Sequence, residues 1–211
     1  MTLLPFDFHI YQTSSSMPRP KDGPSSAPSS GYKSGAENTA LQKHVTFFDR
    51  DMDGIIWPLD TFVGFRSIGF GIFLSTVAAL IIHAGFSWVT FGTLLPDPFF
   101  RLKVENMHRG KHGSDSESYN HLGEFNTQHF DYIFNLYSSE PHTHLTFQEG
   151  VRMLHGNRNP YDPFGWFAAA FEWLATYLML WPADGRMKKE DIRSVYNGSI
   201  FYKLSGRKMP S

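Results

Sequence analysis

Apolar residues recur at helical spacing in several stretches of the chain. Between residues 38 and 48, one helical face carries Leu41, His44, Val45 and Phe48. Further helical patterns cover 127–137, 146–155 and 164–181, and a last helix is expected from 188 to about 196. No stretch shows the alternation of apolar and polar residues that is typical of a strand. The pattern therefore predicts a mainly α-helical fold.

One segment departs from this amphipathic pattern, because residues 67–95 contain no charged side chain. A helix of about 20 apolar residues is long enough to cross the hydrocarbon core of a bilayer. Glycines within the segment and the sequence Pro-Asp-Pro at 96–98 permit bends, and the flanking charges give no orientation. A spanning helix, a helical hairpin that dips into one leaflet and a buried core helix remain alternatives. His83, near the middle, counts against a spanning helix.

The start of the chain has a different composition. Residues 13–36 consist mostly of Ser, Pro and Gly, which cannot bury enough apolar surface to offset chain entropy. We therefore expect a disordered tail over 1–36. The first residues lack the basic start and the long apolar run of a secretory signal. Order is expected to begin near Glu37.

Composition excludes several classes of chemistry. The chain has no cysteine, so disulfide scaffolds, thiolate catalysis, Fe–S clusters and Cys-ligated zinc are excluded. It has 19 basic and 20 acidic residues and no Lys/Arg run, which gives no field to attract a nucleic acid. Charged residues make up only 18% and aromatic residues 16%, so large apolar surfaces must be buried or face lipid.

Residues 49–60 carry oxygen ligands at the spacing of an EF-hand calcium loop. Such a loop supplies ligands from positions 1, 3, 5, 7 and 12. These positions hold Asp49, Asp51, Asp53, the carbonyl of Ile55, and Asp60. Gly54 at position 6 permits the sharp turn, and Ile56 is the apolar residue at position 8. Asp60 replaces the usual Glu and is one methylene shorter, which would weaken bidentate contact with Ca²⁺.

Two later segments, 138–149 and 180–191, look like degenerate versions of this loop. Both have an apolar residue at position 8, Leu145 in the first and Met187 in the second, and Glu149 holds position 12 of the first. Neither has carboxylates at positions 1, 3 and 5 together. We expect both segments to be structural remnants that bind no metal.

Several longer stretches together resemble the caleosin family, which comprises haem peroxygenases associated with lipid droplets. The matching stretches are LQKHVTFFDRDMDGIIWPLDTFVGFR (41–66), LLPDPFF (94–100), KHGSDSESYNHLGEF (111–125), GNRNPYDPFGW (156–166) and DIRSVYNGSIF (191–201). They follow the family's order and cover about 37–205. The family's apolar segment ends in three prolines; here Pro96 and Pro98 match, and Arg101 stands at the third position.

The resemblance implies a b-type haem held by His44, before the calcium loop, and by His112 of the HGSD motif. His108 is an alternative ligand or distal residue. A neutral imidazole suits haem ligation, and both histidines can be neutral at pH 7. Since the two ligands lie on either side of the apolar segment, a single membrane crossing would separate them. The segment must then dip and return, or lie in the interface.

The resemblance also implies an EF-hand unit at 37–66, a membrane-associating segment at 67–100 and a haem-binding helical region at 101–205. The expected function is calcium-dependent oxygen transfer from a fatty-acid hydroperoxide to an unsaturated fatty acid. The expected location is a lipid droplet or the endoplasmic reticulum membrane, facing the cytosol, and a second copy of the chain is a candidate partner in a homo-oligomer. Candidates for the wall of an acyl channel are Phe164, Phe167, Phe171 and Trp173. The alternative is a non-enzymatic, calcium-responsive coat or tether on a lipid droplet.

Overall fold

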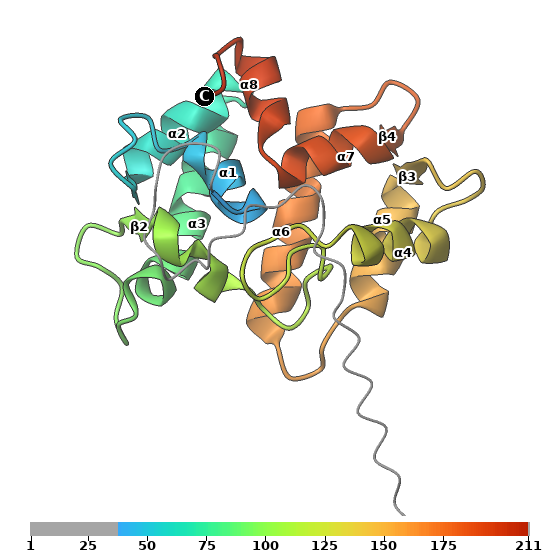
Figure 1. Cartoon of the computed structure of the whole chain (residues 1–211), viewed down its shortest axis with the longest axis horizontal. Helices are drawn as coiled ribbons and strands as arrows, with labels where there is room; N and C mark the ends of the chain where they lie inside the picture. The colour runs from blue at the N-terminus through green and yellow to red at the C-terminus, as the bar shows by residue number, and fades with distance from the viewer. Residues whose placement is uncertain (1–37, 211) are drawn as a thin grey trace, which may run out of the picture.

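The structure, a computed structural model, describes residues 38–210, so the tail expected over 1–36 lies outside the described residues. The described chain is mainly helical, which confirms the predicted fold class (Figure 1). The predicted helices correspond to α4 (Thr127–Tyr137), α5 (Phe147–Gly156), α6 (Pro163–Leu180) and α7 (Lys189–Tyr196). Strands in this part of the chain are limited to segments of two or three residues.

The first helix–loop–helix unit consists of α1 (Ala40–Thr46) and α2 (Pro58–Ser67), with β1 (Ile55–Ile56) in the loop between them. α1 begins after Thr39, whose hydroxyl accepts the backbone N–H of Gln42, while the Gln42 side chain accepts the N–H of Thr39. This reciprocal cap satisfies two donors that the helix cannot use. Gly54 has a φ of 84°, so the loop turns where the sequence predicts.

A second unit of the same layout follows directly. It consists of α3 (Ile72–Phe91), a loop, β2 (Leu102–Lys103) and the short 3-10 helix η2 (Val104–Gly110). β2 pairs antiparallel with β1, and Ile56 lies opposite Leu102. Phe100, two residues before Leu102, has a φ of 54°, just as Gly54 precedes Ile56 by two. After α3, the chain therefore comes back beside the loop between α1 and α2.

The second half of the chain repeats this arrangement. α4 and α5 flank β3 (His144–Thr146), and α6 and α7 flank β4 (Arg186–Lys188). The two strands pair antiparallel with Leu145 opposite Met187, which are the position-8 residues of the two degenerate loops. The described chain thus contains two pairs of helix–loop–helix units, each pair joined by a two-stranded antiparallel sheet.

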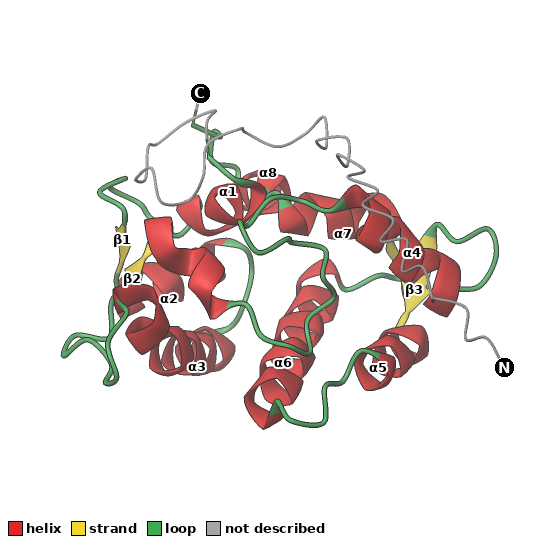
Figure 2. Cartoon of the chain, turned by 60° about the horizontal axis from the view of Figure 1, so that its bottom comes forward, coloured by secondary structure: helices red, strands yellow, loops and turns green. Residues whose placement is uncertain are grey.

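Two apolar clusters form the core, the first mainly from the first pair of units and α8, the second mainly from the second pair. Phe47, Phe48 and Phe65 belong to the first cluster, and Phe130 and Phe134 belong to the second. In both overall views α6 lies between α3 on one side and α5 on the other (Figures 1 and 2). Side chains of α6 contact both clusters, so this helix joins the two halves.

The last helix, α8 (Ser199–Ser205), is absent from the sequence prediction. It has seven residues, too few for stability on its own. Phe201 and Tyr202 pack their rings against Phe47, with centroids 5.4 and 5.1 Å away, so tertiary contact holds the helix. Gly198 precedes it with a φ of 76°, and a Cβ there would lie 2.7 Å from the carbonyl oxygen of Lys43. α8 can therefore approach α1 only through this glycine.

α3 turns its polar side chains toward the protein and many of its large apolar side chains outward. It is the one described helix long and apolar enough to cross a membrane, and 28% of its most apolar window is buried. Its buried side chains are small or polar: Ser75, Ala78, Ala79, His83, Ser87 and Thr90. Exposed apolar side chains on and beyond the helix are Ile72, Phe73, Leu80, Trp88, Leu94, Leu95 and Phe99. A buried core helix would show the opposite distribution, so this alternative from the sequence is wrong.

The loop after α3 is held by Arg101, the residue at the third proline position. Its guanidinium donates two hydrogen bonds to the Asp97 carboxylate, at 2.8 and 2.9 Å. These contacts lower the pKa of Asp97 to about 2. The same guanidinium lies over the ring of Trp57, 5.2 Å from its centroid, and near Phe99. An ion pair therefore holds the loop at the position where the family has its third proline.

Candidate functional site

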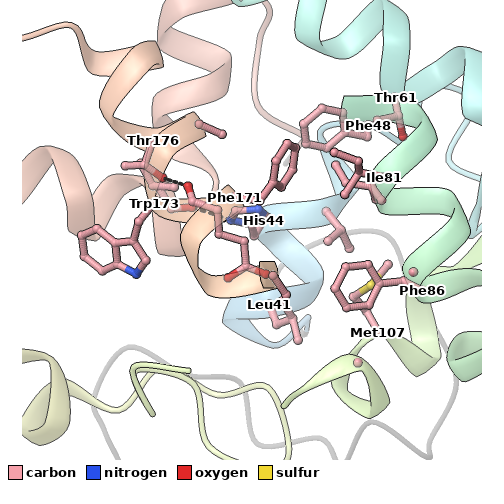
Figure 3. A pocket seen from close by; sticks show the side chains of 18 of the residues that line it. Leu41, His44, Phe48, Thr61, Ile81, Phe86, Met107, Phe171, Trp173 and Thr176 are labelled. Carbon is pink, nitrogen blue, oxygen red and sulfur yellow. Dashed lines mark hydrogen bonds between the residues drawn. The ribbon is translucent and has the colours of Figure 1, made fainter. Parts of the chain in front are cut away.

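A large apolar cavity lies between the first pair of units and α6 (Figure 3). Its volume is about 640 Å³, within the range of about 300–1,000 Å³ that cofactor and ligand pockets occupy. Both predicted haem ligands, His44 and His112, line it. The structure therefore brings together two histidines that the whole of α3 separates in the sequence.

His44 lies on α1, and one of its ring nitrogens forms a hydrogen bond within the protein. Its Nδ1 is 2.7 Å from the carbonyl oxygen of Val195, which can only accept, so Nδ1 carries the proton. The ring also meets Phe201 edge-on at 5.0 Å. Burial lowers the pKa of His44 to about 4, against the opposing effect of this hydrogen bond. The imidazole is therefore neutral at pH 7, and Nε2 keeps a lone pair on a residue that borders the cavity.

His112 follows η2 in a loop, and its ring is close to an acid from another element. Nδ1 lies 3.8 Å from Oδ2 of Asp162, and neither atom has a hydrogen-bond partner among the described residues. Burial lowers the pKa of His112, while Asp115 and Asp162 act in the opposite direction. A Cβ at Gly165 would lie 2.7 Å from Nδ1 and 1.9 Å from Oδ2. The glycine therefore leaves room for this pair.

Asp162 has a second role that explains its position. Its side chain caps α6 by accepting the backbone N–H of Gly165 at 2.8 Å. This bond helps to lower the pKa of Asp162, although burial opposes it. A carboxylate beside the Nδ1 of a ligating histidine fixes the ring and raises its basicity. The Asp-Pro start of a helix is a capping signal, but the sequence alone did not relate Asp162 to His112.

His108, the alternative ligand, lies on η2 and is not among the residues that line the cavity. Burial lowers its pKa. The remaining candidates for the channel wall, Phe164, Phe167, Phe171 and Trp173, all line the cavity. Phe164 stacks edge-on with Phe86 of α3 and with His112, at 5.9 and 6.5 Å. The wall next to the histidines is therefore aromatic and apolar.

The predicted calcium loop gathers three of its carboxylates. Oxygen atoms of Asp49, Asp51 and Asp53 lie within 4.8 Å of one another. Asp49 is buried and accepts the N–H of Gly54 at 2.9 Å, and Asp53 accepts the N–H of Ile55 at 2.7 Å. Hard oxygen donors in a tight loop fit a divalent cation such as Ca²⁺.

Asp60 stands apart from that group of three in the structure. Its Oδ2 accepts the backbone N–H of Trp57 at 3.0 Å and so caps α2. The short side chain is thus engaged at the helix start, and its other oxygen is the one left to turn toward an ion. The expectation of a weakened position 12 stays a prediction.

The degenerate loop 138–149 uses its position-12 acid in another way. Glu149 accepts hydrogen bonds from both the N–H and the hydroxyl of Ser139 and Thr146, at 2.6–2.9 Å. These bonds lower the pKa of Glu149 to about 2, despite its burial. Hydroxyls and amides therefore satisfy the carboxylate that would otherwise face a cation.

Comparisons with known proteins identify the family of the chain. The family described as caleosin related protein matches residues 36–205. A peroxygenase of Lilium longiflorum is 40% identical over 166 residues, which cover 79% of this chain and 70% of that protein. A probable peroxygenase 4 of Arabidopsis thaliana is 40% identical over 171 residues, covering 80% and 86%.

A third relative, named a probable inactive peroxygenase-like protein of Arabidopsis thaliana, is 31% identical over 156 residues, covering 70% of this chain and 71% of its own. No solved structure matches. The helical fold and the similarity to peroxygenases define the class as an oxidoreductase of the peroxygenase type. The chain belongs to the caleosin family.

Proposed function

We propose that the protein is a calcium-dependent haem peroxygenase that transfers oxygen from a fatty-acid hydroperoxide to an unsaturated fatty acid at a lipid surface. The observation that carries this proposal is the cavity, because His44 and His112 both line it although α3 separates them in the sequence. Its aromatic lining suits both a flat macrocycle and an acyl chain.

The residues present fit a haem held by two imidazoles. His44 has Nδ1 bound to a carbonyl and Nε2 without a described hydrogen-bond partner, which is the arrangement of a neutral nitrogen ligand. His112 has a carboxylate, Asp162, beside Nδ1 to orient its ring. When bound, the haem would supply the redox chemistry of the peroxide bond.

The protein would supply orientation and exclude water. Phe164, Phe167 and Phe171 line the cavity next to the histidines and offer apolar contacts to an acyl chain. Such contacts would place an alkene close to the reacting oxygen, which lowers the entropy cost of the transfer. The same lining would keep bulk water from competing for that oxygen.

Calcium would act on His44 through α1. The helix ends at Thr46, and a single turn leads to Asp49, whose N–H donates to the carbonyl of Thr46 at 3.1 Å. An ion held by Asp49 would therefore fix the end of the helix that carries His44. Loss of the ion would reduce oxygen transfer although Ca²⁺ does no redox chemistry.

The outward apolar side of α3 supports docking on a lipid droplet or on the endoplasmic reticulum membrane, from the cytosolic side. Phe73 is 77% exposed and Leu94 is 96% exposed, an arrangement that is costly in water and favourable in an acyl layer. Pairing of β1 with β2 keeps both ends of this segment together. We therefore favour a helix that lies in the interface over one that spans.

The test is an absorption spectrum of the purified protein with and without EDTA, combined with epoxidation of an unsaturated fatty acid by an organic hydroperoxide. A Soret band and activity that EDTA reduces are expected. Protein from a haem-sufficient host without a Soret band would contradict the proposal. The non-enzymatic, calcium-responsive coat would then be the better assignment, since the exposed face of α3 serves it equally.

A further inference from the structure

One acid projects from the apolar wall of the cavity. Glu172 is the one charged residue of α6 and lines the cavity between Phe171 and Trp173, which line it as well. The residue is accessible to solvent, and the cavity that it lines is open. A carboxylate among apolar side chains costs free energy unless a partner compensates it.

The other polar groups near Glu172 have partners. Lys111 forms an ion pair with Asp115 at 3.1 Å and donates to the carbonyl of Tyr119. The hydroxyl of Tyr196 lies 2.7 Å from that of Ser116. By contrast, no residue in the described range 38–210 donates a hydrogen bond to the Glu172 carboxylate or forms an ion pair with it. The acid is therefore available to a molecule in the cavity.

The surroundings of Glu172 bring its pKa close to neutral pH. Burial, followed by repulsion from Asp115, raises the pKa of Glu172 to about 7. Tyr119 and Tyr196 face it from the loop and from α7, and burial raises the pKa of both phenols, so they stay neutral. Lys111 is neutralised by Asp115. Both forms of the acid are populated at pH 7, which allows it to accept and return a proton.

We propose that Glu172 is the acid–base residue of oxygen transfer, an inference that rests on the peroxygenase function proposed above. Its carboxylate takes the proton from the terminal oxygen of the hydroperoxide and delivers it to the oxygen bonded to carbon. The O–O bond breaks with both electrons on that second oxygen, which leaves as the alcohol. The terminal oxygen passes to the acceptor.

The reaction balances without any further reagent. The hydroperoxide is reduced by two electrons to the alcohol, the acceptor is oxidised by two electrons, and Glu172 returns to its starting state. Without the proton transfer, the O–O bond breaks with one electron on each fragment. The resulting alkoxyl radical then fragments instead of leaving as an alcohol.

The experiment compares wild type with Glu172→Gln, which keeps the size of the side chain but cannot exchange a proton. With cumene hydroperoxide as oxidant, wild type should yield 2-phenyl-2-propanol. The variant should yield acetophenone, the fragmentation product, with oxygen transfer slowed on the order of 100- to 10,000-fold. Glu172→Asp should recover part of the alcohol yield and part of the rate of oxygen transfer. Glu190→Gln, an exposed acid of α7, serves as the matched control and should match wild type.

An infrared titration of the purified protein provides a readout that is independent of activity. A carboxylic acid band that titrates near pH 7 is expected in wild type and should be absent in Glu172→Gln. Asp115→Asn should shift this band to lower pH, because it removes the repulsion and frees the charge of Lys111.

Full activity with alcohol as the only product in Glu172→Gln would overturn the proposal. Loss of the Soret band in this variant would overturn it too and would assign Glu172 to holding the haem. Wild type that lacks both haem and oxygen transfer would overturn the proposed function and this role together. A wild type that is active but has no Glu172 band near pH 7 would overturn the acid–base role alone.

Discussion

Ile56 and Leu102 lie opposite each other in an antiparallel strand pair, although the whole of α3 separates them in the sequence. Two strands joined by backbone hydrogen bonds must lie on the same side of a bilayer. The strand pair therefore requires the chain to emerge from the apolar segment on the side of the bilayer where it entered. It also gives a physical reason why His44 and His112 reach one cavity.

Membrane topology is the first prediction. The chain has no cysteine, so single cysteines can be introduced cleanly at Arg50 and at Glu117, both exposed. Both should react with an impermeant thiol reagent on intact droplets or vesicles. Leu94→Cys, at the tip that is 96% exposed, should react only after detergent is added, because lipid covers it. If only one of the two variants, Arg50→Cys or Glu117→Cys, reacted with the reagent, α3 would have to cross the membrane.

Haem ligation is the second prediction. His44→Gly and His112→Ala should each lose the Soret band or shift it, and should lose most oxygen transfer. Added imidazole should restore part of the band in His44→Gly, because it can fill the space of the lost ring. His129→Ala is the control, since this ring is half-exposed and contacts Glu117 at the surface.

The outcome for His108 shows whether this residue is a haem ligand or lies outside the haem site. Because it is not among the residues that line the cavity, His108→Ala should keep the Soret band and lose less activity than either of the other variants. A normal Soret band in both His44→Gly and His112→Ala would end the assignment of this cavity to haem. A Soret band lost in His108→Ala would make this residue a ligand.

The cluster of three carboxylates in the loop after α1 was predictable from sequence because its members are local. Asp49, Asp51 and Asp53 lie within five residues, so spacing alone places their oxygens together. The pairing of Leu145 with Met187 could not be predicted, since the sequence of each degenerate loop contains no sign of which other segment it pairs with. Strand registers of this kind depend on contacts between distant segments.

The outward apolar side of α3 and the role of Glu172 also escaped sequence reasoning. The residues of α3 are almost uniformly apolar, so no periodicity indicates which side faces the protein. Small polar residues such as Ser87 and Thr90 turned out to mark the buried side, through hydrogen bonds from the backbone of Asp97 and Lys103. Glu172 was visible as the one charge of its helix, but only the fold brings it to the cavity.

Calcium affinity is the third prediction. Asp53→Asn keeps an oxygen for the N–H of Ile55 but removes a charge, and it should weaken Ca²⁺ binding by about tenfold or more in calorimetry. Asp60→Glu should tighten binding, because the longer side chain can cap α2 less closely and reach the ion with two oxygens. Asp191→Ala is the control, since its loop lacks the other ligands. Unchanged affinity in Asp53→Asn would reject this loop as the calcium site.

The fourth prediction concerns stability in mild acid, through His83 inside α3. Its Nδ1 donates to the carbonyl of Phe100 and its Nε2 accepts the hydroxyl of Thr61 at 2.7 Å. Burial lowers the pKa of His83 from 6.5 to about 4, against the opposing effect of the hydrogen bond to Phe100, so the folded ring is neutral at pH 7. Between these values the unfolded chain binds a proton that the folded chain does not, so stability falls as pH decreases.

The loss attributable to His83 should approach about 3 kcal/mol by pH 4, from a shift of this size. His44 acts in the same direction, whereas the raised pKa of Glu172 acts in the opposite one, since its folded form holds a proton between pH 4.5 and 7. His83→Gln isolates the effect, because glutamine can donate and accept but does not titrate. In urea unfolding at pH 7 and pH 5, the variant should lose less stability than wild type. An equal loss in both would show that His83 is not held neutral in the folded protein.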